Sequence, residues 1–494
     1  MSIRARLIDP FSHHLLDVLN HLPSTRRYWI GYSGGRDSSV LLHALAGLRP
    51  HLPGDLEICA VHVDHGLSPH AGAWSQHCAT VCAALTIPCQ ILRVSAKPQS
   101  GESPEAAARA ARYQAIIALL APGDVLLTAH HQEDQAETLL LQLLRGAGPH
   151  GLAAMPAHTP LGQGWLARPL LDVTAVELAN YAEQHKLSWV EDPSNFDTDF
   201  DRNYLRHNVI PNLTRQWPAV SRTLSRAAAH AAEAANLLDA LADRDMLQVQ
   251  GPTPDTLSVS GLLTLDEARQ RNVLRRWFKR LNLSVPTTVH LQHIQHDILH
   301  AAADSVPHVR WGNMGTRHHP RATACSYQGA AVPGNQGAVA PVNQGAGAPC
   351  NQGAAAPGYQ GAEARRYRDL IYAMLPLPAH DTNATLTWDM LQPLVLHDIG
   401  MLTATSTLGE GIKVSLLAAT SVTVRFRQGG ERCRPAGRGH THELRKLFQE
   451  RGIPPWQRDR LPLIYIGDEL AAVANLWVCE PFQATHNEPG MVVR

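Results

Sequence analysis

The sequence predicts a doubly wound α/β domain with a parallel sheet, followed by a helical domain and a small mixed α/β C-terminal domain. Between residues 28 and 144, short apolar runs rich in β-formers alternate with longer runs of helical periodicity, as is typical of βαβ units. The chain has 494 residues, enough for two to four domains, and 44% apolar residues with 17% charged residues is an ordinary globular composition. Global disorder and collagen-like repeats are thereby excluded.

Each element of the first domain has its own apolar pattern. The expected strands are Tyr28–Tyr32, Leu56–Val63, Cys89–Val94 and Asp124–Ala129. The expected helices between them are Ser38–Leu48, Ala71–Leu85 and Ser103–Leu120. Helical spacing returns in Arg222–Leu247 and Asp266–Leu281, and strand-like pieces follow in Thr385–Leu417 and Val422–Phe426.

An octapeptide repeats in strict register five times, from Tyr327 onwards. It contains Pro and Gly in nearly every unit and almost no large apolar side chains, which favours a disordered insert over a solenoid. We therefore expect four segments: an N-terminal domain at 1–215, a helical domain at 216–325, the insert at 326–362 and a basic C-terminal domain at 363–494.

The formal net charge is zero, with 43 basic and 43 acidic residues, yet the charge is unevenly distributed. Between Arg425 and Arg460, ten Lys or Arg stand against four acids, a net charge of +6. A solvated surface would explain this, but the glycines and aromatics among the arginines favour contacts with phosphates and bases. Because no apolar run suits a signal peptide or a membrane span, we expect a soluble, cytoplasmic protein with no membrane partner.

The eight cysteines include no CxxC pair, and we expect reduced, buried thiols. Four of them gather between residues 59 and 89, where irregular spacing leaves a metal site as a weaker alternative.

The loop after the first strand has the richest chemistry. It reads SGGRDSS from Ser33 to Ser39 and is followed by an apolar helix. Two glycines allow a tight turn and close approach of a ligand, and hydroxyls with helix N-terminal amides supply donors for an anion. The motif is neither GxxxxGK[ST] nor GxGxxG. An aspartate beside a polyphosphate points to Mg²⁺ bound at Asp37; a tight turn with a helix cap is the alternative.

Three further stretches are expected near the carboxyl edge of the parallel sheet, where the loop after the first strand also lies. The second strand ends in polar groups between Ala60 and Leu67, which suits either a ligand or a strand cap. Arg109 and Arg112, three residues apart, share a helix face and suit phosphates, a transition-state charge or surface salt bridges.

His130, Asp134 and Glu137 have the spacing i, i+4, i+7 of one helix face. Two acids and an imidazole suit a cationic substrate or a proton transfer. Acids favoured by the helix dipole, or a His/Asp/Glu metal site, are the alternatives.

The loop Ser33–Ser38 resembles the SGGxDS signature of the PP-loop family of N-type ATP pyrophosphatases. With the stretches around His62, Arg109 and His130, the chain resembles the tRNA(Ile)-lysidine synthetases of that superfamily. Further matching motifs are Arg145–Gly148, Gly151–Leu152, Arg168–Leu171, Trp189–Asn195, Arg202–His207, Ile210–Pro211, Arg425–Glu431 and Gly452–Arg458.

The resemblance implies ATP-dependent attachment of free L-lysine, through its ε-amine, to C2 of the wobble cytidine of tRNA(Ile) with a CAU anticodon. ATP would adenylate the C2 oxygen with Mg²⁺ at Asp37, and lysine would displace AMP, which changes the codon read from AUG to AUA and the amino acid from Met to Ile. Asp134 and Glu137 would bind the ammonium and accept its proton, in an order that the sequence leaves open.

The residues that the resemblance assigns form three sets. The expected catalytic residues are Asp37, Arg109, Arg112, His130, Asp134 and Glu137. The expected ATP-binding residues are Ser33, Gly34, Gly35, Arg36, Asp37 and Ser38. The expected tRNA-binding residues are Arg202, Arg206, Arg425, Arg427, Arg432, Arg434, Arg445, Lys446 and Arg458.

Two other functions compete with this interpretation. A tRNA thiolation enzyme of the same superfamily would use paired cysteines or an iron–sulfur cluster, and the CxxC it would need is absent. A non-catalytic tRNA-binding protein would carry a vestigial loop, whereas the loop here is intact. The oligomeric state stays open, a homodimer being one option.

Overall fold

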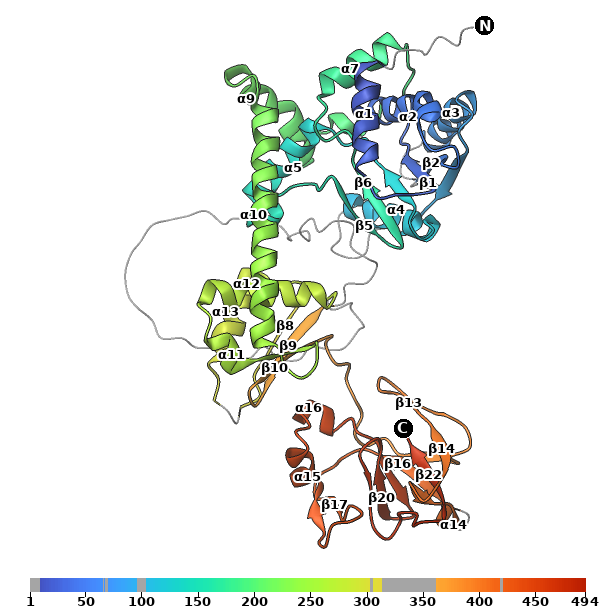
Figure 1. The fold of residues 1–494 in the computed structure, drawn as a ribbon, viewed down its shortest axis with the longest axis vertical. Coiled ribbons are helices and arrows are strands. Elements are labelled where there is room, and N and C mark those ends of the chain that lie inside the picture. The colour runs from blue at the N-terminus through green and yellow to red at the C-terminus, as the bar shows by residue number, and fades with distance from the viewer. Residues whose placement is uncertain are drawn as a thin grey trace, which may run out of the picture. The chain divides into compact units, whose positions relative to one another are not determined.

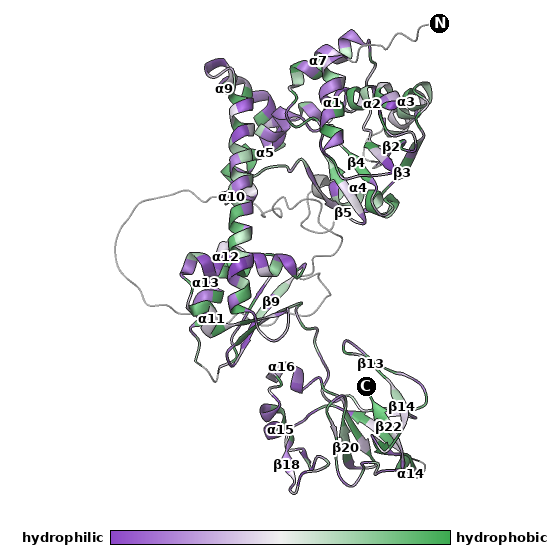
Figure 2. Ribbon diagram, in the orientation of Figure 1, coloured by the Kyte–Doolittle hydropathy of each residue, from purple (hydrophilic) through white to green (hydrophobic). Residues whose placement is uncertain are grey.

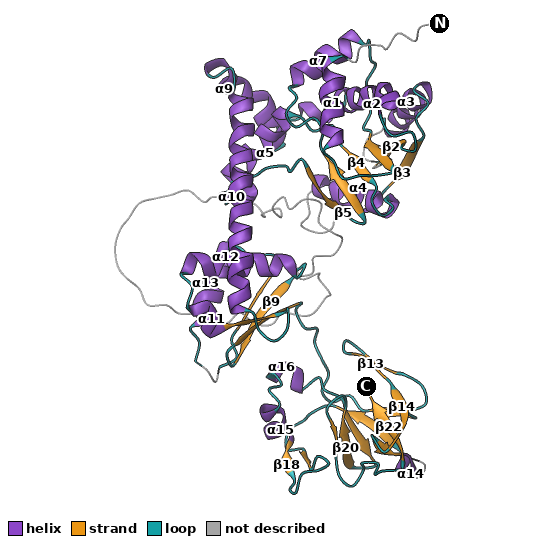
Figure 3. Ribbon diagram, viewed as in Figure 1, coloured by secondary structure: helices purple, strands orange, loops and turns teal. Residues whose placement is uncertain are grey.

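The computed structural model describes residues 9–64, 66, 70–95, 104–302, 305–312, 361–417 and 421–494. The chain divides into two compact units, one within residues 1–241 and one made of residues 242–316 and 360–494. Figure 1 shows the course of the chain, and Figure 3 its helices and strands. The insert predicted at 326–362 lies outside the described residues except for its last two, Gly361 and Ala362.

The first unit contains a six-stranded sheet in the order β3-β2-β1-β4-β6-β5. Its strands are β1 (Arg27–Gly31), β2 (Glu57–Asp64), β3 (Cys89–Arg93), β4 (Val125–Leu127), β5 (His158–Leu161) and β6 (Gly164–Ala167). All neighbours pair in parallel except β5 with β6. The four strands expected from sequence are confirmed within about two residues at each end, and β5 and β6 extend the sheet.

Helices cover both faces of this sheet, which makes it doubly wound as expected. They are α1 (Pro10–Asn20), α2 (Arg36–Leu48), α3 (Ala71–Ala84), α4 (Pro104–Leu119), α5 (Gln132–Leu144), α6 (Pro149–Leu152) and α7 (Ala175–Gln184). On one face α1, α2, α3 and α7 bury a core around Leu15, Leu41 and Ile30. On the other face Tyr113 and Ile116 of α4 pack against Trp29 and Leu126. Burial on both faces explains why the strands are continuously apolar.

Short helical segments complete the first unit beyond the sheet. They are η1 (Arg49–His51), η2 (Pro193–Phe196), α8 (Asp201–Tyr204), the π-helical turn η3 (Leu205–Val209) and α9 (Ile210–Gln216). The long helix α10 (Val220–Val249) begins in this unit and ends in the second. Figure 2 shows apolar and polar bands alternating along α10, the pattern that predicted it.

The second unit contains helices, as expected for the middle domain, and also a sheet that was not expected. Besides α11 (Val259–Leu263), α12 (Glu267–Arg280), α13 (Thr288–His293) and η4 (Ile294–Leu299), it contains an antiparallel sheet in the order β7-β10-β9-β8. Its strands are β7 (Thr256–Ser258), β8 (His308–Trp311), β9 (Ala362–Tyr367) and β10 (Leu370–Met374). Because β9 and β10 pair with strands that precede the insert, the residues after 362 continue the middle module, and the boundary expected at 363 was wrong.

The C-terminal part is mixed α/β, as predicted, and is built mainly of short antiparallel strands. A five-stranded sheet consists of β11 (Leu386–Trp388), β16 (Val422–Arg425), β19 (Leu463–Ile466), β20 (Glu469–Val473) and β21 (Trp477–Val478). Smaller sheets are formed by β12 (Leu394–Leu396) with β13 (Gly400–Leu402), by β14 (Ala404–Leu408), β15 (Ile412–Lys413) and β22 (Pro489–Val493), and by β17 (Arg432–Cys433) with β18 (His442–Glu443). The helices are α14 (Val414–Leu417), α15 (Leu444–Glu450) and α16 (Pro455–Arg458).

Two further findings concern the cysteines and the membrane. Cys433 and Cys479 form a disulfide, so the expectation that every cysteine is reduced was wrong for this pair. The two residues are 46 positions apart, and only the fold brings them together. Within the described ranges, no helix has both the length and the apolar composition that crossing a membrane requires.

Candidate functional site

The loop between β1 and α2 is held rigid by its own hydroxyls. Gly35 caps α2, and its carbonyl oxygen accepts hydrogen bonds from Ser38 Oγ at 2.9 Å and Ser39 Oγ at 3.0 Å. Ser33 Oγ lies 3.0 Å from Ser38 Oγ. Gly34 has φ = +85°, and a Cβ there would lie 3.0 Å from Cys78 Sγ. The loop therefore requires glycine at position 34 and presents the first amides of α2 as donors for an anion.

Asp37 occupies the first turn of α2, beside this loop. Arg36 Nε donates to Asp37 Oδ1 at 3.0 Å, and His131 Nε2 lies 3.6 Å from Asp37 Oδ2. Burial alone would raise the pKa of Asp37, but the neighbouring charges of His131 and Arg36 outweigh it and lower the pKa below its usual value. The carboxylate is thus ionised, and its binding of Mg²⁺ stays a prediction.

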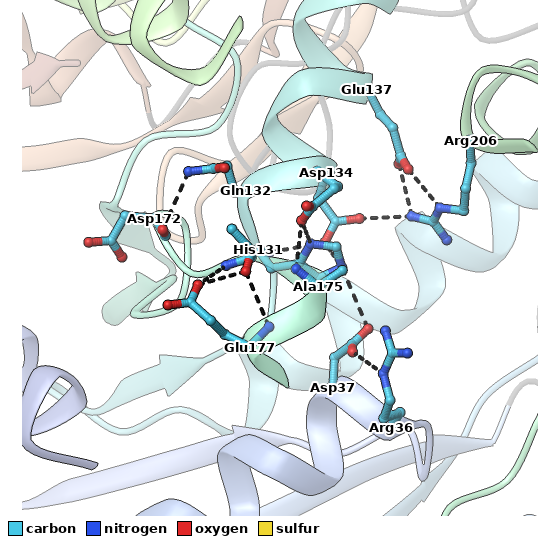
Figure 4. Close-up of polar contacts among 12 residues, drawn as sticks. Arg36, Asp37, His131, Gln132, Asp134, Glu137, Asp172, Ala175, Glu177 and Arg206 are labelled. Carbon is cyan, nitrogen blue, oxygen red and sulfur yellow. Dashed lines mark hydrogen bonds and ion pairs between the residues drawn. The ribbon is translucent and has the colours of Figure 1, made fainter. Parts of the chain in front are cut away.

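His131 joins Asp37 to α5, and the sequence analysis did not select it. Its Nδ1 lies 2.9 Å from Glu133 Oε2, and its Nε2 lies 3.5 Å from Asp134 Oδ2 (Figure 4). Burial disfavours the charged ring, but hydrogen bonds to Asp37 and Glu133 and the charge of Asp134 raise the pKa of His131 to about 10. A protonated imidazole therefore bridges the loop and the acidic residues. The only sequence signal was its place next to His130.

Asp134 and Glu137 are buried on α5 and already hold two arginines. Arg202 donates from Nε to Glu137 Oε2 at 2.8 Å and from Nη2 to Asp134 Oδ1 at 3.1 Å. Arg206 donates from Nε to Glu137 Oε1 at 2.6 Å and from Nη2 to Asp134 Oδ1 at 2.9 Å (Figure 4). Burial would raise the pKa of Asp134, but His131 and the two arginines lower it to about 2.

This cluster differs from the expectation in two ways. Arg202 and Arg206 pair with the two acids, because α8 and η3 place both guanidinium groups against α5, and their expected contact with tRNA stays a prediction. His130 does not share a helix face with the acids, because α5 begins only at Gln132. Its Nδ1 lies 2.9 Å from Thr128 Oγ1, and burial together with nearby arginines keeps its pKa well below the usual value.

The expected arginines of α4 lie beside an aromatic ring. The guanidinium carbons of Arg109 and Arg112 are 5.1 Å and 5.6 Å from the ring centre of Tyr113. Arg109 is exposed and close enough to lower the pKa of His130. His65 and Leu67, from the stretch expected after the second strand, lie outside the described residues.

The expected tRNA-binding residues of the C-terminal part fall into two groups. Arg425, Arg427 and Arg434 form ion pairs with Asp468, Asp459 and Glu480, respectively. Arg458 donates to Ile453 O at 2.8 Å and to Tyr367 Oη at 2.9 Å. Arg432, Arg445 and Lys446 are exposed, and none has an ion pair with another described residue. Asp468 and Glu480 lie outside the segment 425–460, so they compensate two of its six net positive charges.

The alternative metal sites gain no support from the described part of the chain, where no group of three or more His, Cys, Asp or Glu side chains has an arrangement that could hold a metal ion. Cys59, Cys78, Cys82 and Cys89 are free thiols, with Cys78 Sγ 3.4 Å from His62 Nδ1.

The parallel sheet, the glycine loop after β1 and the ionised aspartate at the start of α2 define the class of a PP-loop nucleotide-binding protein. The family models agree: a PP-loop domain matches residues 8–213, a TilS substrate binding domain residues 257–331 and a TilS substrate C-terminal domain residues 422–494.

Close relatives match over nearly the whole chain. A tRNA(Ile)-lysidine synthase of Coxiella burnetii is 43% identical over 96% of this chain and 94% of its own. One of Methylococcus capsulatus is 39% identical over 94% and 95%, and one of Yersinia pseudotuberculosis 37% identical over 95% of each. The chain therefore belongs to the tRNA(Ile)-lysidine synthase family, which confirms the resemblance seen in the sequence.

Among solved structures, a U34-tRNA thiolase from Methanococcus maripaludis covers 44% of this chain and 76% of its own, with a TM-score of 0.39 and 16% identity. A likeness at this level carries no weight for the function.

Proposed function

We propose that this protein is an ATP-using ligase that joins the ε-amine of free L-lysine to C2 of the wobble cytidine of tRNA(Ile) with a CAU anticodon. The family assignment supports this function over tRNA thiolation. The reaction changes the codon read from AUG to AUA and the amino acid from Met to Ile. ATP is cleaved to AMP and pyrophosphate, because the C2 oxygen leaves readily only after adenylation.

The main observation that supports the proposal is an unbroken chain of ion pairs from the loop after β1 to helix α5. The loop residue Asp37 is linked through His131 to Asp134, and Asp134 through Arg202 and Arg206 to Glu137. The element that would hold ATP and the element that would meet the nucleophile are therefore parts of one polar network. A vestigial loop would have no need of a charge balance with α5, so the network favours a catalyst over a passive tRNA-binding protein.

The residues present fit ATP and Mg²⁺. Donors of the loop suit the phosphates, and Mg²⁺ is commonly bound by one or two carboxylates together with substrate phosphates. Asp37 is ionised, about one-third exposed and beside the loop, so it is the residue that would hold the ion. When bound, the ion neutralises the charge of the leaving pyrophosphate. The residues Ser33, Gly34, Gly35 and Ser38 would hold the phosphates.

The acidic pair is better suited to binding than to taking a proton. A carboxylate with a pKa of about 2, as at Asp134, is a weak acceptor for the proton of an amine whose usual pKa is about 10.4. Arg202 and Arg206 fix both carboxylates in place, so their free lone pairs would orient the ε-ammonium. We therefore assign Asp134 and Glu137 to positioning the nucleophile, and Arg112 to the charge on the reacting phosphate.

The test is the release of AMP and pyrophosphate from ATP in the presence of lysine and tRNA(Ile) with a CAU anticodon. Asp37→Asn should abolish release, because it removes the charge that would hold Mg²⁺. Asp55→Asn, which changes an exposed acid outside the network, is the matched control and should leave release unchanged. Equal activity of both variants would refute the assignment of Asp37. Measuring the molar mass in solution tests the homodimer separately.

A further inference from the structure

Arg168 is a buried arginine whose charge no described carboxylate balances. Its side chain follows β6 directly and is 5% exposed. Nη1 donates to Pro156 O at 2.7 Å, whereas Nε is buried without a hydrogen-bond partner in the described part of the chain. A buried cation without a counter-ion is costly, and a buried polar group without a partner often marks the place of a ligand. Guanidinium groups bind carboxylates and phosphates especially well.

The register of the sheet places Arg168 at the edge where ligands bind. Leu127 of β4 pairs with Ala167 of β6, and Thr128 N donates to Ala167 O at 3.0 Å, so Thr128 and Arg168 leave neighbouring strands side by side. Thr128 in turn contacts His130. In parallel α/β sheets this carboxyl edge is the usual site for ligands.

Arg109 provides a second positive charge at the same place. Its helix α4 packs through Tyr113 on the face formed by Leu126 of β4 and Leu166 of β6. The guanidinium carbon of Arg109 is 5.1 Å from the ring centre of Tyr113, which packs on this part of the sheet. Burial lowers the pKa of Arg168, and the charge of Arg109 lowers it further. The acidic cluster cannot balance them, because Asp134 and Glu137 are already paired with Arg202 and Arg206. Arg168 and Arg109 are therefore positive charges beyond those that pair with the acids of α5.

Three oxyanions take part in the proposed reaction, and the geometry favours one of them. The phosphates of ATP belong to the loop after β1, which is two strands away from β6 and thus about 10 Å distant at roughly 4.8 Å per strand. A phosphate of the RNA backbone lies on a broad polymer and suits an exposed arginine better than one that is 5% exposed. The carboxylate of a free amino acid is small enough to reach a buried guanidinium.

We propose that Arg168, assisted by Arg109, binds the α-carboxylate of free lysine, an inference that rests on the proposed function. The charges of Arg168 and Asp134 both act on the imidazole of His130. The arrangement offers a guanidinium group for the carboxylate and, as proposed above, the Asp134 carboxylate for the ammonium. Lysine, which has a carboxylate on its α-carbon and an ammonium at the end of its side chain, matches this arrangement, and a diamine without a carboxylate does not.

The experiment compares lysine with 1,5-diaminopentane, which is lysine without its carboxylate, as the nucleophile. Arg168→Met should raise the KM for lysine about 10- to 100-fold, the worth of a charge-assisted hydrogen bond, and leave the KM for the diamine unchanged. Arg109→Met leaves the bond between Arg168 and Pro156 intact and should raise the KM for lysine by a smaller factor. This variant tests the proposal if Arg168→Met fails to fold. Arg49→Met, an exposed arginine remote from the motif, is the control.

Each other outcome overturns the proposal. A rise in the KM for ATP with lysine unaffected would assign Arg168 to a nucleotide phosphate, and a rise in the KM for tRNA would assign it to the RNA backbone. Equal losses with lysine and the diamine would show that Arg168 only supports the fold. If the unaltered protein transfers no lysine, the proposed function itself fails, which is a distinct result.

Discussion

His131 carries the proton that joins the ATP loop to the acidic pair, and its contribution to stability depends on pH. Because folding raises its pKa from 6.5 to about 10, that contribution is complete below pH 6.5 and is lost as the pH rises through 10. We expect the difference in free energy of unfolding between the native protein and His131→Gln to shrink steadily from pH 6.5 to pH 10. Urea unfolding in metal-free buffer measures it, and a constant difference across this range would contradict the bridge.

Glu137 is 1% exposed and depends on its arginines for charge compensation. Arg206→Met should therefore lower the free energy of unfolding by about 3 kcal/mol, as expected when one partner of a buried ion pair is removed. The double variant Arg206→Met/Glu137→Gln should recover part of that loss.

The exposed pair of Arg438 and Glu450 serves as the comparison, where Arg438→Met should cost less than about 1 kcal/mol. If the effects of Arg206→Met and Glu137→Gln simply add, the two residues do not depend on each other and the description of the cluster is wrong.

At the scale of single residues, sequence could predict those that stand in a local motif. Asp37, Asp134 and Glu137 belong to short recognisable runs, and the structure brings them into one network. His131 was not predicted as a site residue, because it contacts Asp37, which is far away in sequence. Arg168 was not predicted either, because its burial and its lack of a described counter-ion are properties of the fold. The roles of Arg202 and Arg206 were assigned to tRNA for the same reason: positive charge is visible in a sequence, but its counter-ion is not.

The loop between β1 and α2 depends on one glycine more than on its neighbour. Gly34→Ala should lower the free energy of unfolding by about 1–2 kcal/mol, because position 34 has positive φ and its Cβ would press on Cys78. Gly35→Ala, at φ = −77° with its nearest atom 3.5 Å away, should cost less. Adding Cys78→Ala should relieve Gly34→Ala in part, and failure of this rescue would show that the contact is unimportant. Thermal unfolding measures all three.

Helix α15 presents two of the exposed cations of the C-terminal part, Arg445 and Lys446. We expect Arg445→Ala and Lys446→Ala to weaken tRNA binding and to reduce the slope of log affinity against log salt by roughly 0.7–0.9 each. Arg458→Ala should leave that slope unchanged, because Arg458 is bonded to Ile453 and Tyr367. Filter binding across salt concentrations gives the slopes. A lower slope for Arg458→Ala would show that Arg458 contacts tRNA after all.

At the scale of elements, local periodicity predicted the strands and helices whose neighbours in the fold are also neighbours in sequence. The β-strands and helices of the first domain were expected nearly at their observed bounds, because each βαβ unit is contiguous in sequence. The sheet β7-β10-β9-β8 was not predicted, because its strands are only 3 to 6 residues long. In addition, the pairings of β7 with β10 and of β8 with β9 join strands from the two sides of the repeat insert. Non-local pairing of short strands leaves little trace in a sequence.

For the whole molecule, the three family models follow one another along the chain in the order PP-loop, substrate binding and C-terminal domain. Their order agrees with the expected succession of a nucleotide-binding domain, a middle domain and a basic domain. Only the boundary expected at 363 differs, because β9 and β10 belong to the middle module. The zero net charge hides an uneven distribution: acids and arginines compensate each other in the polar network around α5, and exposed cations such as Arg445 and Lys446 lie on α15.

The central claim is that this chain transfers lysine to one cytidine of one tRNA at the expense of ATP. The most direct measurement is incorporation of labelled lysine into purified tRNA(Ile) with a CAU anticodon, run beside tRNA(Met), which shares that anticodon. We predict lysine-dependent labelling of tRNA(Ile) only, one AMP released for each lysine attached, and no labelling with Asp37→Asn. AMP release without lysine transfer, or labelling of both tRNAs alike, would contradict the account.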